Sequence, residues 1–128
     1  MKDVATARLF LTLAALAGAL AVMLGAFGAH ALKARLAPDM LAIYQTAVQY
    51  QFWHVLALAL IGVLALHLPG SAALRLAGWL MLVGIAVFSG SLYVLALTGI
   101  RALGMVTPFG GLAFIAGWLA LARAVWKG

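Results

Sequence analysis

The 128-residue sequence contains no cysteine and no glutamate. Without cysteine the chain has no disulfide, no thiolate metal ligand and no cysteine nucleophile. Its only acids, Asp3 and Asp39, lie outside the long apolar runs, so those runs hold no pair of carboxylates for acid–base catalysis. We therefore predict a protein that is not an enzyme.

Charge is also scarce. Charged residues make up 8% of the chain and hydrophobic residues 68%, whereas ordinary soluble domains carry about 25% charged residues. The mean hydropathy of +1.21 places the chain in lipid. The net charge of +6 is spread over termini and connections, which is typical of residues that flank membrane spans and not of a nucleic-acid-binding surface. We expect contact with membrane lipids and none with nucleic acid.

Four apolar runs, at about residues 8–29, 40–67, 74–98 and 108–126, have the length of transmembrane helices. The first run is too long for the apolar region of a signal peptide and three further runs follow it, so we expect it to be retained. The predicted fold is all-α: a single-domain, polytopic membrane protein formed by a four-helix bundle.

The connections carry their own start and stop signals. Residues 28–40 alternate leucines with basic residues, which predicts a short amphipathic helix at the membrane interface between the first two spans. Pro38 should end it, and Asp39 should cap the next helix. Thr107 and Pro108 predict an N-cap followed by the first residue of the last helix.

The basic residues favour one orientation. In a four-span chain, the termini and the middle connection share a side and carry five cations, whereas the other two connections carry three. The positive-inside rule then predicts that both termini lie in the cytoplasm. The two sets are Lys2, Arg8, Arg75, Arg123 and Lys127 against Lys33, Arg35 and Arg101.

One stretch, Tyr44–His54, places polar side chains within a predicted span. Six of them share one half of the helical wheel, whereas Tyr44 and Gln51 fall on the other side. These side chains either bond across the bundle and hold the helices in register, or line a polar cavity that binds a headgroup or metabolite or relays protons. The six are Gln45, Thr46, Gln49, Tyr50, Trp53 and His54.

Metal and haem sites are not expected. His54 lies about 20 Å along the second helix from the level of His30, and His67 about 20 Å further on. Ligands of one ion must lie at one level, so no pair of histidines within one chain fits and we predict no metal and no cofactor; an intermolecular pair in an oligomer remains open. Ser89 or Ser91 could pair with His54, but no Gly-x-Ser-x-Gly motif supports a hydrolase. We predict no catalytic residue.

Four ordered motifs together resemble a known family. They are Gly25–Lys33 (GAFGAHALK), Tyr44–His54 (YQTAVQYQFWH), Phe88–Tyr93 (FSGSLY) with Leu97–Gly99, and Thr107–Gly111 (TPFGG). This pattern is similar to that of the small membrane proteins catalogued as domain of unknown function 423, whose animal branch is named transmembrane protein 256. The resemblance implies a four-helix protein of the bacterial inner membrane, in a family without an assigned activity.

The motifs all fall in one membrane half of an alternating bundle, so we predict that their polar side chains converge there. Stripes of small residues on the first, third and fourth helices favour close helix packing. We therefore expect an accessory or interaction module of a membrane complex or homo-oligomer. The alternative is a polar pocket around His54 that binds or transports a lipid headgroup, small polar metabolite or proton. The predicted site residues are His30, Gln45, Gln49, Tyr50, His54, Ser89, Tyr93 and Thr107.

Overall fold

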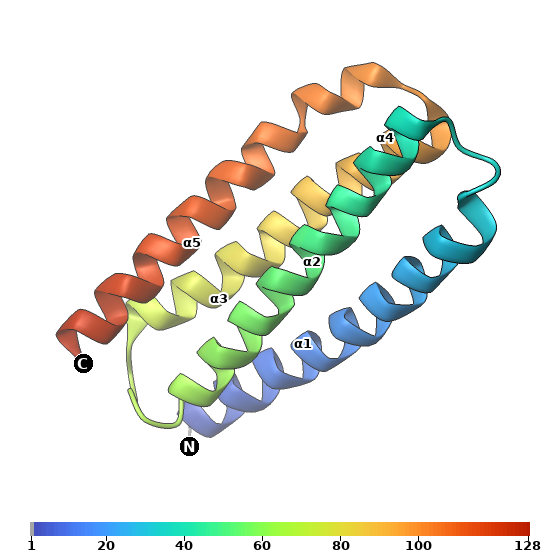
Figure 1. The fold of residues 1–128 in the computed structure, drawn as a ribbon. Coiled ribbons are helices and arrows are strands. Elements are labelled where there is room, and N and C mark those ends of the chain that lie inside the picture. Colours follow the sequence, from blue (N-terminus) through green and yellow to red (C-terminus); the bar gives the residue numbers. More distant parts are fainter. Residues whose placement is uncertain (1) are drawn as a thin grey trace.

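The computed structural model describes residues 2–128 and is entirely helical in its regular structure. Segments α3, η2 and α4 follow one another without a break, so the chain forms four long rods (Figure 1). All four are long and apolar enough to cross a membrane, which confirms the predicted fold class. The elements are α1 (Lys2–Phe27), the π-helical turn η1 (Gly28–Leu32), α2 (Pro38–Leu64), α3 (Ala72–Gly84), the π-helical turn η2 (Ile85–Ser89), α4 (Gly90–Thr98), the 3-10 turn η3 (Arg101–Met105) and α5 (Thr107–Lys127).

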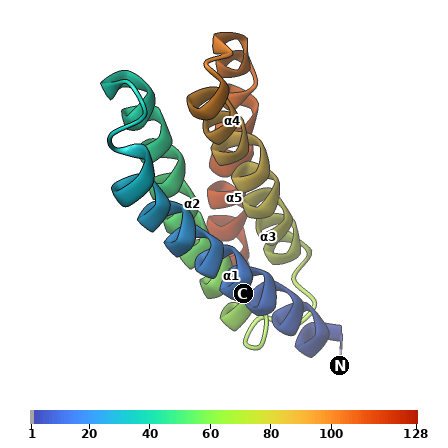
Figure 2. The ribbon, with the colours of Figure 1, turned by 90° about the vertical axis from the view of Figure 1, so that its right-hand side faces the viewer.

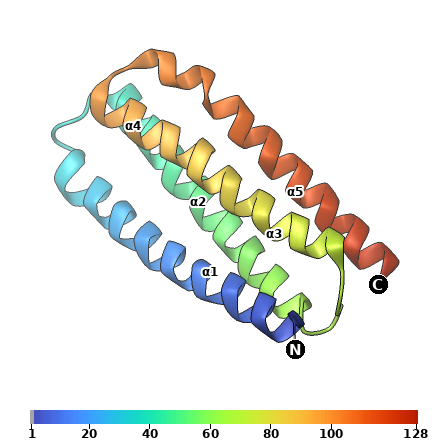
Figure 3. The same ribbon diagram turned by 180° about the vertical axis from the view of Figure 1, so that it is seen from behind.

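The rods alternate in direction. Both termini and the α2–α3 loop lie at one end, which we call the terminal end, and the α1–α2 connection and η3 lie at the other (Figures 1 and 3). Helix α1 packs along α2, and α3 packs along α5. The resulting hairpins lie side by side (Figure 2), with α2 against α3, η2 and α4. This order brings α2 into contact with helices on two sides.

Close approach between rods depends on glycine at defined points. A Cβ on Gly28 would overlap the ring of Tyr44, and one on Gly110 would overlap the backbone of Phe88. Dispersion between closely approaching backbones is a main source of helix association in lipid, because lipid tails are as apolar as the side chains. The glycines therefore set the spacing of η1 against α2 and of α5 against η2.

The apolar core lies toward the terminal end. Its largest fully buried side chains include Phe10 from α1, Leu58 and Ile61 from α2, and Leu74 and Met81 from α3. A much smaller buried cluster of Leu32, Tyr44 and Ala96 lies toward the other end. Polar side chains adjoin both clusters: the Tyr44 hydroxyl bonds the Leu24 carbonyl at the smaller one, and His54 stacks on Phe114 of the larger one.

Three local predictions were wrong. Residues 28–40 form no separate amphipathic helix, because α1 continues through η1 before a short turn. Asp39 does not cap α2: the helix begins at Pro38, Ala37 holds the cap position without a side-chain bond, and Asp39 pairs with Arg101 at 3.2 Å. Thr107 is the first residue of α5, not its cap. Its hydroxyl bonds a side chain of α4, as described below.

Candidate functional site

Eight polar side chains from α2, η2, α4 and α5 bond to groups across or along the bundle, and we call them the polar cluster. Each of these side chains lies on a helical turn that faces a neighbouring rod. Its members are Tyr44, Gln51, His54, Ser89, Ser91, Tyr93, Thr107 and Trp118.

Gln51, the middle residue of α2, joins three rods. Its Nε2 donates to the carbonyl of Ala17 on α1 at 2.9 Å, and its Oε1 accepts from the hydroxyl of Tyr93 on α4 at 2.6 Å. Tyr44 reinforces this link: its hydroxyl donates to the Leu24 carbonyl at 2.5 Å, and its ring lies edge-on to Tyr93 with centroids 5.3 Å apart. One amide thus fixes α1, α2 and α4 at a common level.

The π-helical turn η2 directs two serines to opposite neighbours. The Ser89 hydroxyl donates to the Ala47 carbonyl of α2 at 2.8 Å. The Ser91 hydroxyl lies 2.6 Å from that of Thr107 on α5 and donates to the Phe88 carbonyl at 2.9 Å. Local π-helical turns often occur where a helix carries a function. Here the turn connects the third rod to both α2 and α5.

His54 is held through both ring nitrogens. The indole Nε1 of Trp118 donates to its Nε2 at 3.1 Å, and an indole nitrogen can only donate. The imidazole proton therefore lies on Nδ1, which donates to the Tyr50 carbonyl at 2.7 Å. The ring also stacks on Phe114 at a centroid distance of 3.5 Å. With 5% of its surface exposed, this neutral imidazole keeps no free lone pair for a metal or substrate.

The cluster is internally complete. Among the side chains described by the structure, no buried nitrogen or oxygen lacks a hydrogen-bond partner. Ser89 and Ser91 bond to Ala47, Phe88 and Thr107 rather than to His54. Within residues 2–128, no group of three histidines or acids is placed to hold a metal ion. What this arrangement does chemically is fix helices against one another.

The predicted residues divide into two groups. His54, Ser89, Tyr93 and Thr107 belong to the polar cluster, and Tyr50 contributes its carbonyl and a ring that packs on Phe88 at 4.4 Å. The remaining three, His30, Gln45 and Gln49, are exposed and do not join it.

Sequence reasoning missed four members of the cluster: Tyr44, Gln51, Ser91 and Trp118. The helical wheel placed Tyr44 and Gln51 opposite the face that carries the other six polar residues. Because Tyr44 and Gln51 are seven residues apart, they share a second face of the helix. That spacing was the available signal. Nothing in the sequence pairs Trp118 with His54, 64 residues earlier.

The two exposed glutamines line a shallow hollow between α1 and α2, which we call the glutamine groove. Its volume is about 370 Å³. Neither glutamine forms a hydrogen bond within residues 2–128. The lining residues are Gly25, Gly28, Ala29, Tyr44, Gln45, Val48 and Gln49.

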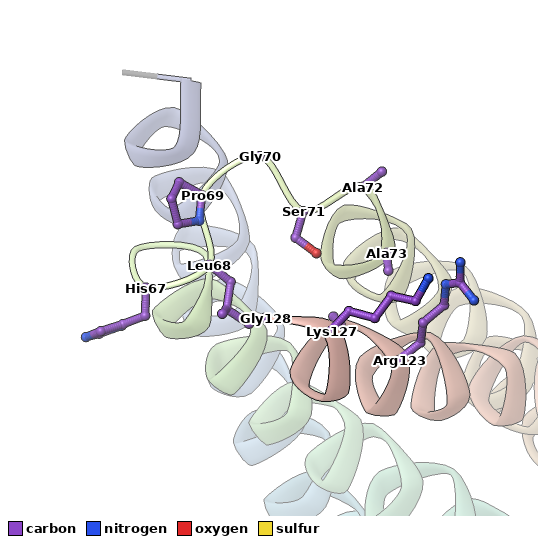
Figure 4. Close-up of a pocket in the computed structure, with 11 residues that line it drawn as sticks. His67, Leu68, Pro69, Gly70, Ser71, Ala72, Ala73, Arg123, Lys127 and Gly128 are labelled. Atoms are coloured by element: carbon purple, nitrogen blue, oxygen red, sulfur yellow. The ribbon is translucent and has the colours of Figure 1, made fainter.

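A second hollow, of about 500 Å³, lies at the terminal end between the α2–α3 loop and the last turn of α5. Arg123 and Lys127 extend their side chains toward the first turn of α3, beside Ala72 and Ala73 (Figure 4). This is the most basic of the described hollows, and it lies outside the polar cluster.

Residues 24–111 match the family described as a protein of unknown function, DUF423. The chain belongs to this family. It is 47% identical over 122 residues to a UPF0382 membrane protein of Staphylococcus haemolyticus, covering 94% of this chain and 97% of that protein. It is 45% identical over 120 residues to the UPF0382 membrane protein YwdK of Bacillus subtilis, covering 94% of this chain and 98% of that protein. No solved structure gives a significant match.

The family match bears on the site directly. Residues 24–111 include the whole glutamine groove and all side chains of the polar cluster except that of Trp118. The resemblance drawn from the sequence motifs is thus confirmed, as is a membrane protein with bacterial relatives.

Proposed function

We propose that this protein is a non-enzymatic interaction module of the membrane, a rigid four-helix unit that docks laterally in a membrane complex or homo-oligomer. The observation that carries the proposal is the closed bonding of the polar cluster. A cluster in which every buried nitrogen and oxygen of the described side chains has a hydrogen-bond partner orders the bundle and offers no reactive group.

The competing function, a binding or transport pocket around His54, requires a hollow that reaches this ring. Three hollows are described: the glutamine groove, the hollow at the α2–α3 loop, and one beside Trp118 and Trp126. His54, Gln51 and Tyr93 line none of them. Because both nitrogens of His54 are engaged, proton relay would also require the Trp118 bond to break.

Proton flux into vesicles tests the two functions against each other. We expect vesicles that contain the protein to take up protons no faster than empty vesicles under an imposed pH gradient. Flux that His54→Phe abolishes, while the lipid-facing control Leu119→Ala leaves it intact, would overturn the module and establish a conduction pathway. Circular dichroism of both variants checks that the bundle is retained.

We also propose that the membrane is the bacterial inner membrane, with both termini in the cytoplasm. The five-to-three distribution of cations supports this orientation. Arg123 and Lys127 concentrate positive charge at the terminal end (Figure 4), where anionic cytoplasmic lipids would attract it.

Cysteine labelling tests this orientation, because the natural chain contains no cysteine. In intact cells, a membrane-impermeant maleimide should label Ala34→Cys in the α1–α2 connection and leave His67→Cys, at an exposed position of the α2–α3 loop, unlabelled. The reverse pattern would place the termini outside. Labelling of both sites after permeabilisation is the control for accessibility.

A further inference from the structure

We infer that the glutamine groove is the contact surface of a two-fold homodimer, in which Gln45 and Gln49 of one copy hydrogen-bond to those of a second copy. This inference rests on the proposed function and names its partner. Three observations support it: the depth of the two amides, their lack of partners, and the small residues beside them.

Depth comes first. Helix α2 has 27 residues, so it is about 40 Å long at 1.5 Å per residue. Gln49 lies two residues from the middle residue, Gln51, or about 3 Å along the axis, and Gln45 about 9 Å. A hydrocarbon core about 30 Å thick extends about 15 Å to each side of its centre. When the middle of α2 is placed at the centre of the bilayer, both amides lie within the hydrocarbon, and Gln49 is too deep for its side chain to reach the interface.

The two amides have no hydrogen-bond partner among the described residues of their own chain. Both side chains are exposed on the bundle surface, and neither forms a hydrogen bond within residues 2–128. Lipid tails offer no donor or acceptor, so an unpaired amide in hydrocarbon is unfavourable. By contrast, the hydroxyl of nearby Thr46 bonds its own helix at the Ala42 carbonyl. The two glutamines stand out as groups that require a partner outside the chain.

A second copy is the partner that fits this chemistry. A primary amide carries both donors and acceptors, so a glutamine is complementary to itself. A two-fold axis places the same patch on both sides of an interface, and Gln49 would then meet the partner's Gln49 with both kinds of group paired. An ionised headgroup phosphate can only accept hydrogen bonds and stays near the interface, so it would leave the amide oxygens unpaired.

The surroundings of the glutamines suit a close helix contact. Gly25 of α1 and Ala29 of η1 line the groove beside them, and small residues let helix backbones approach. Along α2 the same surface continues at i+7 from Gln49 with Leu56, which is 65% exposed. The contact would thus begin with the amides and extend over apolar side chains toward the terminal end.

Single-cysteine cross-linking in vesicles tests the dimer, since the natural chain has no cysteine. In purified protein with Gln49 retained, Gln45→Cys should form disulfide-linked dimers upon mild oxidation. The matched control, Leu119→Cys, places a cysteine on an exposed face of α5 and should cross-link only at the rate of random collision. Equal cross-linking at the two positions would overturn the proposal.

A second measurement isolates the amide. Fluorescence energy transfer between labelled copies gives a dissociation constant, and Gln49→Leu should raise it about eightfold if two reciprocal bonds of about 0.6 kcal/mol are lost. Gln49→Asn, which keeps the amide, should recover part of the affinity. An unchanged constant in Gln49→Leu would overturn the role of the amides, and circular dichroism confirms that the variant folds.

The outcomes separate this inference from the proposed function. If the wild-type protein remains at its 13.3 kDa monomer mass in native mass spectrometry and a different membrane protein cross-links at Gln45→Cys in native membranes, the dimer is overturned and the module stands. If His54-dependent proton flux is observed, the module is overturned whatever the oligomeric state.

Discussion

The two halves of the bundle, on either side of Gln51, are joined by different contacts. In the half nearer the termini, Phe10, Ile61 and Met81 pack in the larger apolar core. In the other half, Tyr44, Ser89 and Tyr93 each donate a hydrogen bond to a neighbouring rod. The His54–Trp118 bond lies where the halves meet.

The difference shows two ways of joining helices without a hydrophobic driving force. In lipid, apolar packing stabilises a bundle only when two helix surfaces fit each other more closely than lipid tails fit them. The stability of an apolar contact therefore depends on the shapes of the side chains. A hydrogen bond between rods requires a donor atom that faces an acceptor atom, so the stability of a polar contact depends on the identity of single atoms. The terminal half should therefore respond to changes of volume, and the other half to changes of a single polar atom.

The largest effect is expected for Phe10→Ala in the terminal half. Phe10 is 1% exposed, lies over Gly78 and contacts Trp79 edge-on at 5.6 Å. Truncation leaves a cavity, and we expect a loss of about 3 kcal/mol, the low end for such changes because no transfer from water is involved. Unfolding by denaturing detergent measures this loss. Phe27→Ala, on the exposed surface, is the control. Equal losses of stability in the two variants would contradict the claim that close packing stabilises the terminal half.

Gly110→Ala should have the next largest effect. The added Cβ overlaps the backbone of Phe88, which cannot rotate away, so we expect a loss of about 2 kcal/mol by overpacking. Gly90→Ala is the matched control, because nothing lies within 4 Å of a Cβ there. Thermal unfolding followed by circular dichroism compares them. If both variants unfold alike, the contact between α5 and η2 does not depend on close approach.

Trp118→Phe removes the donor to His54 and keeps an aromatic ring. The buried Nε2 of His54 then lacks its partner, and we expect a loss of about 1–2 kcal/mol. Trp126→Phe, at a side chain that is 90% exposed, should have no effect on the same detergent titration. Nitrogen NMR of the imidazole should show the proton on Nδ1 in the natural protein; a proton on Nε2 would contradict the bonding described above.

The smallest expected effect belongs to Tyr93→Phe, which deletes one hydroxyl in the polar half. The lost bond to Gln51 should cost about 0.6 kcal/mol, the average for hydrogen bonds between membrane helices. Tyr50→Phe is the control, because the Tyr50 hydroxyl forms no hydrogen bond in the described part of the chain. An equal or larger loss for Tyr50→Phe in detergent unfolding would show that the bond between Tyr93 and Gln51 does not account for the effect of Tyr93→Phe.

Much of the fold was predictable because the relevant signals are local. Long apolar runs and short connections specify four antiparallel rods, and loop glycines such as Gly70 and Gly99, both with positive φ, mark where rods end. The errors at Asp39 and Thr107 have a common cause. Each side chain was assigned to its own helix end, yet each is engaged by a residue distant in sequence, Arg101 and Ser91 respectively.

The site was only partly predictable for a different reason. Helical periodicity shows that Gln45 and Gln49 share a face and that Tyr44 and Gln51 share another. It does not show which of the two faces packs inside the bundle, since both are polar.

The sequence by itself determined that this is a four-span membrane protein with polar residues in one half of its second span. Only the tertiary structure decided which of those residues are internal. The physical reason is steric and directional: Gly28 admits the Tyr44 ring, and the carbonyl of Ala17 and the hydroxyl of Tyr93 meet Gln51. That packing turns Gln45 and Gln49 outward.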